Sequence, residues 1–164
     1  MSDGHDFDDF YRSTRQRLVG FVYVMTGDLA EAQDVVHEAF VRAWQRWSTV
    51  GRYEDPESWV RVVATRLAIS RWRGLRSRIR AHVRHGPPVP VAAPSTETLE
   101  IVEALRQLPE AQRRALALHY LFGLSVAETA RETGVPVGTV KARLSRGRAT
   151  LAKLLTDEPE GAVS

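Results

Sequence analysis

A basic cluster lies near the end of the chain, made of four residues within a short stretch: Lys141, Arg143, Arg146 and Arg148. No Asp or Glu occurs between Glu132 and Asp157, so neighbouring carboxylates do not cancel this charge. The planar guanidinium of arginine can hold a phosphate or a guanine edge through two parallel hydrogen bonds. The chemistry that this cluster predicts is therefore the binding of a polyanion, with nucleic acid favoured.

The residues before and within the cluster predict the elements that position it. Ser125 followed by Glu128 has the spacing of a capping box, which starts a helix over about 126–132. Gly134 can take the positive φ that ends this helix, and Pro136 is suited to precede a second helix over about 137–155. Four apolar residues of the second helix recur at helical spacing and are expected to pack inward: Val140, Leu144, Leu151 and Leu155. This layout is typical of a helix-turn-helix, whose second helix lies in the major groove of DNA. A solvated basic face on a structural helix is the alternative.

Composition excludes several classes of protein. The chain has 164 residues, 43% of them hydrophobic, which argues against wholesale disorder and allows one domain or two small ones. It has no cysteine, so disulfides, thiolate nucleophiles and cysteine zinc sites are absent. The apolar stretch 18–25 is too short to cross a bilayer, and the acidic start is unlike a signal peptide. We expect a soluble cytoplasmic protein without membrane insertion.

The sequence lacks the catalytic motifs that would indicate an enzyme. His37-Glu38 lacks the second histidine of a metalloprotease helix, because Val41 stands at that position. No glycine-rich phosphate loop follows a strand, and no serine sits in a nucleophile elbow. We expect no catalytic residue, no metal site and no cofactor, and therefore a protein that is not an enzyme.

The first part of the chain predicts three helices. Aromatic and aliphatic residues recur three or four positions apart from Phe7 to Met25, which indicates an amphipathic helix. Asp28 caps a second helix, with Glu31 at the capping-box position. The outer face of this second helix is polar and carries Asp34, His37, Glu38, Arg42 and Gln45. A solvated face is the simplest interpretation of these five residues.

A loop over residues 48–54 leads to a third helix, which Asp55-Pro56 begins and which runs to about Arg73. Its inward residues include Val60 and Ala64, which leaves several arginines and two tryptophans on the remaining surface. These surface residues are Arg61, Arg66, Arg71 and Arg73 with Trp59 and Trp72. Arginines interleaved with aromatic rings are typical of a surface for single-stranded nucleic acid. Tryptophan is more often partly buried in a core, which is the alternative.

Proline among small residues over 87–94 opposes helix and indicates an extended linker. The expected fold is all-α, with two small helical domains joined by a flexible linker and a helix-turn-helix in the second. The expected boundaries are a first domain over 1–74, an Arg/Pro-rich linker over 75–96, a second domain over 97–156 and a disordered tail over 157–164.

Three segments in this order resemble one family. They are D-L-A-E-A-Q-D-V-V-H-E-A-F-V-R-A-W from Asp28, P-E-S-W-V-R-V-V-A-T-R-L-A-I-S-R-W-R from Pro56, and L-S-V-A-E-T-A through G-T-V-K-A-R-L-S-R-G-R from Leu124 to Arg148. Together they resemble an extracytoplasmic-function (ECF) sigma factor of bacterial RNA polymerase, in the sigma-70 family. The resemblance spans nearly the whole chain and implies a factor that binds core polymerase, reads the minus-10 and minus-35 promoter elements and initiates transcription.

The resemblance also implies roles for individual residues. The polar face of the second helix, Asp34, His37, Glu38, Arg42 and Gln45, would dock on the clamp of the largest polymerase subunit. The minus-10 strand would meet Arg52, Tyr53, Trp59, Arg61 and Arg66. The minus-35 duplex would meet Thr139, Lys141, Ala142, Arg143, Ser145 and Arg146. The flap region of the polymerase is a further implied partner, and an anti-sigma factor is a possible one.

Two other functions stay open on the residues alone. A stand-alone helix-turn-helix regulator would bind duplex DNA tightly without polymerase, usually as a dimer on spaced half-sites. An interaction module for a sensor protein would bind no DNA under any condition, and its basic helix would be incidental.

Overall fold

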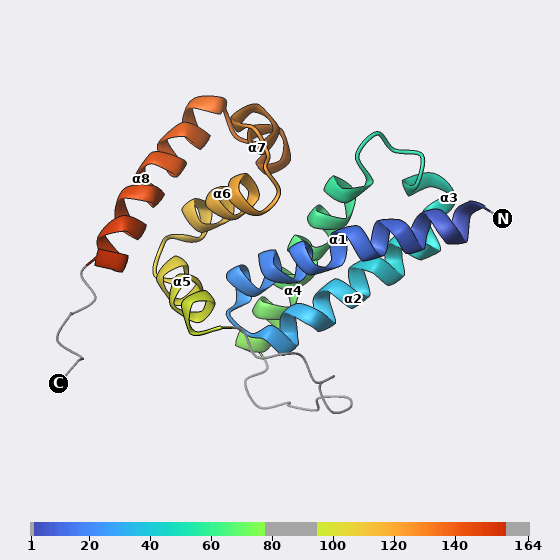
Figure 1. Cartoon of the computed structure of the whole chain (residues 1–164), viewed down its shortest axis with the longest axis horizontal. Coiled ribbons are helices and arrows are strands. Elements are labelled where there is room, and N and C mark those ends of the chain that lie inside the picture. Colours follow the sequence, from blue (N-terminus) through green and yellow to red (C-terminus); the bar gives the residue numbers. More distant parts are fainter. Residues whose placement is uncertain (1, 78–94, 157–164) are drawn as a thin grey trace. The chain divides into compact units, whose positions relative to one another are not determined.

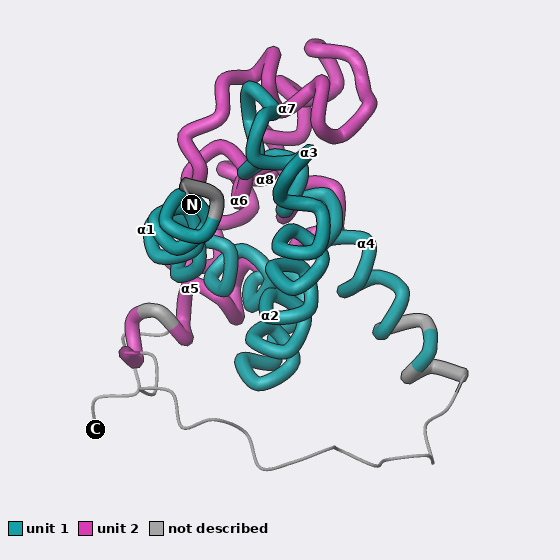
Figure 2. The backbone as a smooth tube through the Cα atoms, turned by 90° about the vertical axis from the view of Figure 1, so that its right-hand side faces the viewer, with its two compact units in different colours: residues 1–91 teal, residues 92–164 magenta. Residues whose placement is uncertain are grey.

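The computed structural model describes residues 2–77 and 95–156, and the regular structure of these residues is helical (Figure 1). The chain divides into two compact units, 1–91 and 92–164 (Figure 2). The prediction of an all-α protein with two helical domains is confirmed. Most of the predicted linker and the predicted tail lie outside the described residues, so the proposed domain boundaries stay predictions. None of the described helices is long and apolar enough to span a membrane.

The described part of unit 1, residues 2–77, forms three long helices and one helical turn. They are α1 (Ser2–Thr26), α2 (Leu29–Gln45), α3 (Trp47–Val50) and α4 (Pro56–Ser77). The helices α1, α2 and α4 pack on one another in all three pairs. Leu18, Phe21, Val36 and Val60, at most 1% exposed, lie at the centre of this core. Full burial of one such side chain contributes about 1.5–3 kcal/mol, so this shared core holds the three helices in register.

The aromatic stripe predicted on the first helix is part of the core. Phe7 of α1 lies against Trp44 and Trp47, with ring centroids 5.0 and 5.3 Å apart. Tyr11 meets Phe40 edge to face at 4.9 Å. Edge-to-face and tilted pairs at these distances add to the stability gained from burial. This cluster fixes the end of α2 and the start of α3, from which the following loop departs.

Polar contacts define the start of α2 and tie it to α4. The side chain of Asp28 accepts a hydrogen bond from the Glu31 amide at 3.1 Å, as the capping motif predicts. The Glu31 carboxylate lies 3.5 Å from the Arg71 guanidinium of α4. Glu31 thus contributes its amide to the cap and its carboxylate to the contact with α4, and the Asp28 amide donates to the Thr26 hydroxyl at 3.3 Å.

Two boundaries differ from the sequence prediction. Residues 47–50, predicted largely as loop, form the helical turn α3, because Trp47 and Val50 turn inward and are buried. The third predicted helix continues past Arg73 to Ser77. The irregular loop is thus shorter than expected and consists of residues 51–55.

Unit 2 contains α5 (Thr96–Arg106), α6 (Glu110–Leu121), α7 (Val126–Thr133) and α8 (Val137–Thr156). The helix α8 packs on α5, α6 and α7. Its buried residues are Val140, Leu144 and Gly147. The prediction that Leu155 packs inward is wrong, because Leu155 is 44% exposed. Gly147 continues the buried row instead, and the helix comes so near α6 there that a Cβ atom would lie 2.8 Å from Leu116 Cδ1.

Candidate nucleic-acid interface

The predicted turn of the helix-turn-helix is present in unit 2. The Ser125 hydroxyl accepts a hydrogen bond from the Glu128 amide at 3.0 Å, and the Glu128 carboxylate accepts one from the Ser125 amide at 3.1 Å. Gly134 has a φ of 70° and donates its N–H to the Ala130 carbonyl at 2.9 Å. Glycine takes this left-handed conformation without steric cost, so the chain can end α7 and turn into α8 within three residues.

The six residues predicted for duplex contact all lie in the first half of α8. Val140 and Leu144, at most 2% exposed, anchor this half of the helix in the unit 2 core. The remaining faces hold the candidates: Lys141, Ser145 and Arg146 are exposed, and Thr139, Ala142 and Arg143 are half-buried. No acidic residue lies in the first turn of α8, so the positive end of the helix dipole adds to the charge of these side chains.

Two features of this surface were missed by the sequence analysis. Val137, the first residue of α8, is 42% exposed, which suits contact with a thymine methyl group. The Arg148 Nε donates to the Tyr120 hydroxyl of α6 at 2.6 Å, with the guanidinium carbon 5.6 Å from the ring centroid. The position of Val137 at the start of the predicted helix could have suggested it as a contact residue. The Tyr120 contact joins residues 28 positions apart, and no local pattern predicts it.

The helix α6 contributes further positive charge to unit 2. The Nε atoms of Arg113 and Arg114 are buried and have no hydrogen-bond partner among the described residues. Burial lowers the pKa of Arg113, the charge of Arg106 lowers it further, and Glu110 opposes the shift. Because an arginine side chain stays protonated in proteins, the group keeps its charge and adds to the positive field of unit 2.

A groove in unit 1 lies between α2 and α4 and has a volume of about 530 Å³. Eight residues line it: Arg42, Gln45, Arg46, Trp59, Val63, Arg66, Leu67 and Ser70. The groove joins residues that were predicted for two tasks, since Arg42 and Gln45 were assigned to polymerase docking and Trp59 and Arg66 to the minus-10 strand. Arg46 was missed, although its position four residues after Arg42 on a helix would have placed both on one side. Three guanidinium groups and one indole ring in a groove suit phosphates and an unpaired base.

The predicted polar face of α2 is at the surface. Asp34, His37, Arg42 and Gln45 are exposed and Glu38 is half-buried. The Arg42 Nε lies 3.2 Å from the Glu38 carboxylate, as a neighbouring pair one turn apart. A pair as exposed as this contributes at most about 1 kcal/mol to stability, so both side chains can rearrange around a partner.

The loop candidates and Arg61 have different surroundings. Arg52 and Tyr53 lie on the loop 51–55 and are exposed. The expectation that Arg61 lies on the surface is wrong, because its side chain is only 3% exposed. Its guanidinium lies 3.7 Å from Asp55 and 3.5 Å from Glu57. The two carboxylates offset the hydration that the guanidinium loses on burial. The helical pattern alone could not identify this burial, because it does not show which charged partners lie nearby.

Comparison with known proteins identifies both units. The family models for sigma-70 region 2 and sigma-70 region 4 match residues 10–78 and 98–151. The ECF RNA polymerase sigma factor SigM of Mycobacterium tuberculosis is 31% identical over 155 residues, which cover 93% of this chain and 79% of SigM. The chain belongs to the ECF sigma factors of bacterial RNA polymerase. As an ECF sigma factor, it is an alternative sigma factor that directs RNA polymerase to promoters.

Other relatives also match nearly the whole length of this chain. The ECF sigma factor SigW of Bacillus subtilis is 29% identical over 173 residues, covering 94% of this chain and 91% of SigW. Among solved structures, the sigma factor RpoE of Bartonella quintana, in complex with the anti-sigma factor NepR, matches with a TM-score of 0.74. It is 23% identical, and the match covers 94% of this chain and 99% of RpoE. The likeness to RpoE supports the ECF sigma factor fold.

Proposed function

We propose that this ECF sigma factor reads its promoters through two surfaces, α8 for the duplex minus-35 element and the loop and groove of unit 1 for the minus-10 strand. The observation that carries the proposal is the arrangement of α8. Buried Val140 and Leu144 anchor the helix after a capped turn, and its outer faces present Lys141 and Arg146 with no carboxylate on the same helix. This is the arrangement that places a recognition helix in the major groove.

The minus-10 surface combines the exposed loop with the groove. Arg52 and Tyr53 stand on the loop, and Trp59 and Arg66 line the groove between α2 and α4. An unpaired base can stack on an aromatic ring, while guanidinium groups hold the phosphates on either side of it. The stacking offsets the few kcal/mol that removing a base from the duplex costs. Arg61 is not assigned to DNA, because its guanidinium is already paired in the interior.

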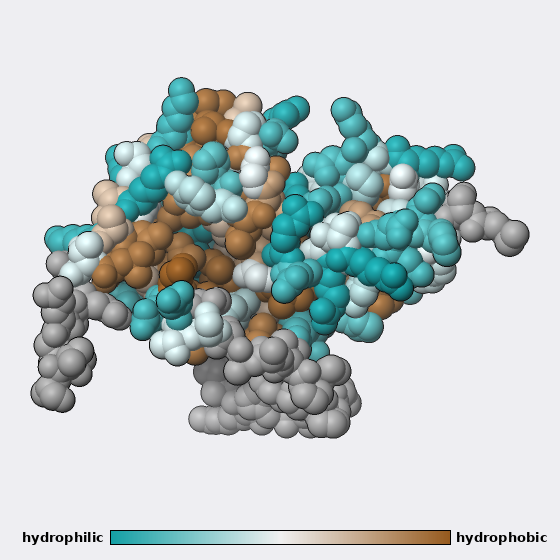
Figure 3. All heavy atoms as spheres, in the orientation of Figure 1, coloured by the Kyte–Doolittle hydropathy of each residue, from teal (hydrophilic) through white to brown (hydrophobic). Residues whose placement is uncertain are grey.

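The polymerase would contact both units. In unit 1 the outer face of α2, with Asp34, His37 and Glu38, would dock on the clamp of the largest subunit. In unit 2 Leu99 and Ile101 of α5 are 44% and 47% exposed, and Figure 3 shows hydrophobic surface over this helix. We assign this apolar surface to the flap region, since exposed apolar patches mark protein contacts. The polymerase would supply the catalysis, and the sigma factor would act in the cytoplasm without a cofactor.

An anti-sigma factor is a further proposed partner. The solved structure of RpoE contains the anti-sigma factor NepR, and that of CnrH contains the cytosolic domain of CnrY. RpoE and CnrH both share the fold of this chain, with TM-scores of 0.74 and 0.67. Binding of such a partner over the polymerase-facing surfaces would keep the factor inactive until it is released.

Run-off transcription with bacterial core polymerase tests the proposed function. The wild-type chain should give transcripts that the core alone does not give, and an Arg143→Ala, Arg146→Ala double variant should reduce them roughly 30-fold or more. This magnitude follows from about 1–3 kcal/mol of discrimination for each bidentate arginine contact with a base. Lys153→Ala is the matched control, because Lys153 is an exposed cation in the last turn of the same helix. Specific duplex binding by the isolated protein, without any transcript, would favour a stand-alone regulator.

A further inference from the structure

The loop that carries Arg52 and Tyr53 is fixed where it leaves α3. The Gly51 amide donates to the Trp47 carbonyl at 2.9 Å, and the amides of Arg52 and Tyr53 donate to Thr49 and Val50 at 3.1 and 3.0 Å. A Cβ atom on Gly51 would lie 2.8 Å from the Trp47 carbonyl oxygen and 2.9 Å from its ring. The first half of the loop is therefore wound closely onto α3.

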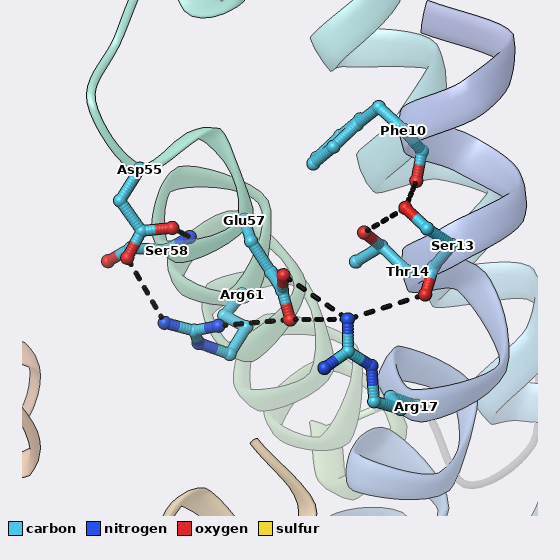
Figure 4. Close-up of polar contacts among 8 residues, drawn as sticks. All are labelled: Phe10, Ser13, Thr14, Arg17, Asp55, Glu57, Ser58 and Arg61. Atoms are coloured by element: carbon cyan, nitrogen blue, oxygen red, sulfur yellow. Dashed lines mark hydrogen bonds and ion pairs between the residues drawn. The ribbon is translucent and has the colours of Figure 1, made fainter. Parts of the chain in front are cut away.

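The other end of the loop is held by both carboxylate oxygens of Asp55. Oδ1 accepts a hydrogen bond from the Ser58 amide at 3.1 Å and caps α4. Oδ2 lies 3.7 Å from Nη2 of Arg61, one turn further along the helix than Ser58. One side chain thus ends the loop, starts the helix and meets a buried guanidinium (Figure 4).

Arg61 continues a chain of alternating charges that reaches α1. Its Nη1 lies 3.5 Å from the Glu57 carboxylate, which in turn lies 3.3 Å from Nη2 of Arg17. Arg17 also donates to the Ser13 carbonyl of its own helix at 3.3 Å. Figure 4 shows Arg61 between the two carboxylates and Glu57 between the two arginines. These contacts connect the end of the loop to α1 as well as to α4.

Stability alone does not account for a charged residue at this position. The Arg61 side chain is 3% exposed, whereas the Asp55 side chain is 55% exposed, and an apolar side chain in place of a charge buried in this way is often neutral or stabilising. A buried charge does, however, demand its partners at fixed positions, because leaving it unpaired is costly. Recognition by a loop needs the same property, since contact residues must be held close to their productive geometry.

We propose that Arg61 is a positioning residue for minus-10 recognition, which holds Asp55 and so fixes the loop that presents Arg52 and Tyr53 beside the groove. This role rests on the proposed function of unit 1 in reading the minus-10 strand. Arg61 touches no DNA in this arrangement, and its effect on the promoter passes through Asp55.

Two substitutions separate the positioning role from the helix cap. Arg61→Met removes the buried charge. Asp55→Asn removes the charge of the partner but keeps an oxygen that can cap α4, because asparagine caps as well as aspartate. If one variant does not fold, the other still decides. Arg61→Lys keeps the charge without the planar fork and should restore part of the loss.

The readout is a pair of ratios from run-off transcription with the full chain and core polymerase. One ratio compares initiation at a promoter with its intact and its substituted minus-10 element, and the other does the same for minus-35. Both variants should lower the minus-10 ratio roughly fivefold or more, because two contact side chains lose their fixed positions. The minus-35 ratio and the affinity for core polymerase should stay unchanged. The double variant should lose no more than either single variant, since both remove one interaction.

Glu31→Gln is the matched control, because it breaks another ion pair between helices of unit 1, Glu31 with Arg71 at 3.5 Å, away from the loop. It should leave both ratios at the wild-type value. Amide hydrogen exchange at Arg52 and Tyr53 should accelerate in Arg61→Met and not in Glu31→Gln, because only the former frees the loop.

Two results would overturn the positioning role. One is a wild-type minus-10 ratio in both variants, and the other is an equal fall of both ratios, which is the pattern of general destabilisation. The proposed function fails separately, and the positioning role with it, if the wild-type factor itself does not discriminate between intact and substituted minus-10 elements.

Discussion

Replacement of Gly147 by alanine should destabilise unit 2, although alanine is the better helix former. The added Cβ would lie 2.8 Å from Cδ1 and 3.3 Å from Cγ of Leu116, and 3.4 Å from Cδ2 of Leu108. Both leucines are 2% exposed, so any shift that relieves the contact has to be made within the core. Overpacking of a core costs about 1–3 kcal/mol, and the gain in helix propensity is about 1 kcal/mol. The expected net loss in the free energy of unfolding is about 0–2 kcal/mol.

Ala149→Gly measures the propensity term on the same helix. Ala149 is exposed two residues further along α8, so its replacement should cost about 1 kcal/mol without any change in packing. Urea unfolding of the full chain followed by circular dichroism at 222 nm gives both values. Tryptophan fluorescence in the same samples reports unit 1 alone, because the four tryptophans stand at positions 44, 47, 59 and 72.

The steric clash at Gly147 is refuted if Gly147→Ala raises the stability of unit 2 by as much as Ala149→Gly lowers it. That result would mean that α8 can accept a methyl group towards α6, and that the close approach does not constrain the helix. If the clash is present, the same variant should also weaken minus-35 reading, because any outward shift of α8 moves the residues on its DNA-facing side.

Three further substitutions test individual contacts, and two of them have a matched control substitution. Thr129→Val should raise the free energy of unfolding by up to about 1 kcal/mol, because its hydroxyl is buried with no hydrogen-bond partner among the described residues. Thr65→Val, which removes a buried hydrogen bond of 2.8 Å, should bring no such gain in the same urea experiment. Ser125→Ala should cost about 1 kcal/mol through the lost cap, and an unchanged urea midpoint would contradict the capping box. Gly51→Ala should lower the stability of unit 1 by about 1–3 kcal/mol, whereas Gly20→Ala, with no atom within 4 Å, should raise it by about 1 kcal/mol, both followed by tryptophan fluorescence.

Much of the fold could be predicted because its determinants are local. Ser125 with Glu128, Gly134 and Asp55-Pro56 each act on the backbone within a few residues, so their spacing identifies a helix start or end. The buried faces of α1 and α2 follow from the recurrence of apolar residues at helical spacing. The outward positions of Lys141 and Arg146 on α8 could be predicted for the same reason, whereas Thr139, Ala142 and Ser145 were named only through the resemblance to the family.

The features that could not be predicted depend on contacts between helices, which the spacing of residues in the sequence does not reveal. Arg61 was expected on the surface because charge usually indicates exposure, and only its partners Asp55 and Glu57 make burial possible. The inward role of Gly147 requires knowledge of how near α6 lies. Likewise, Arg42 and Trp59 fall in different predicted helices, and only the packing of α2 on α4 brings them to one groove.

That shared groove has a thermodynamic consequence. Arg42 and Gln45 come from the helix proposed to meet the polymerase, and Trp59 and Arg66 from the helix proposed to meet the melted strand. A ligand that orders one wall changes the free energy with which the other wall binds, and this coupling is reciprocal. If polymerase docking raises the affinity for the minus-10 strand by some factor, binding of the strand must raise the affinity for polymerase by the same factor. One coupling constant would then account for two properties. The free sigma factor would bind the strand weakly, and the holoenzyme would bind its promoter more tightly as the duplex opens.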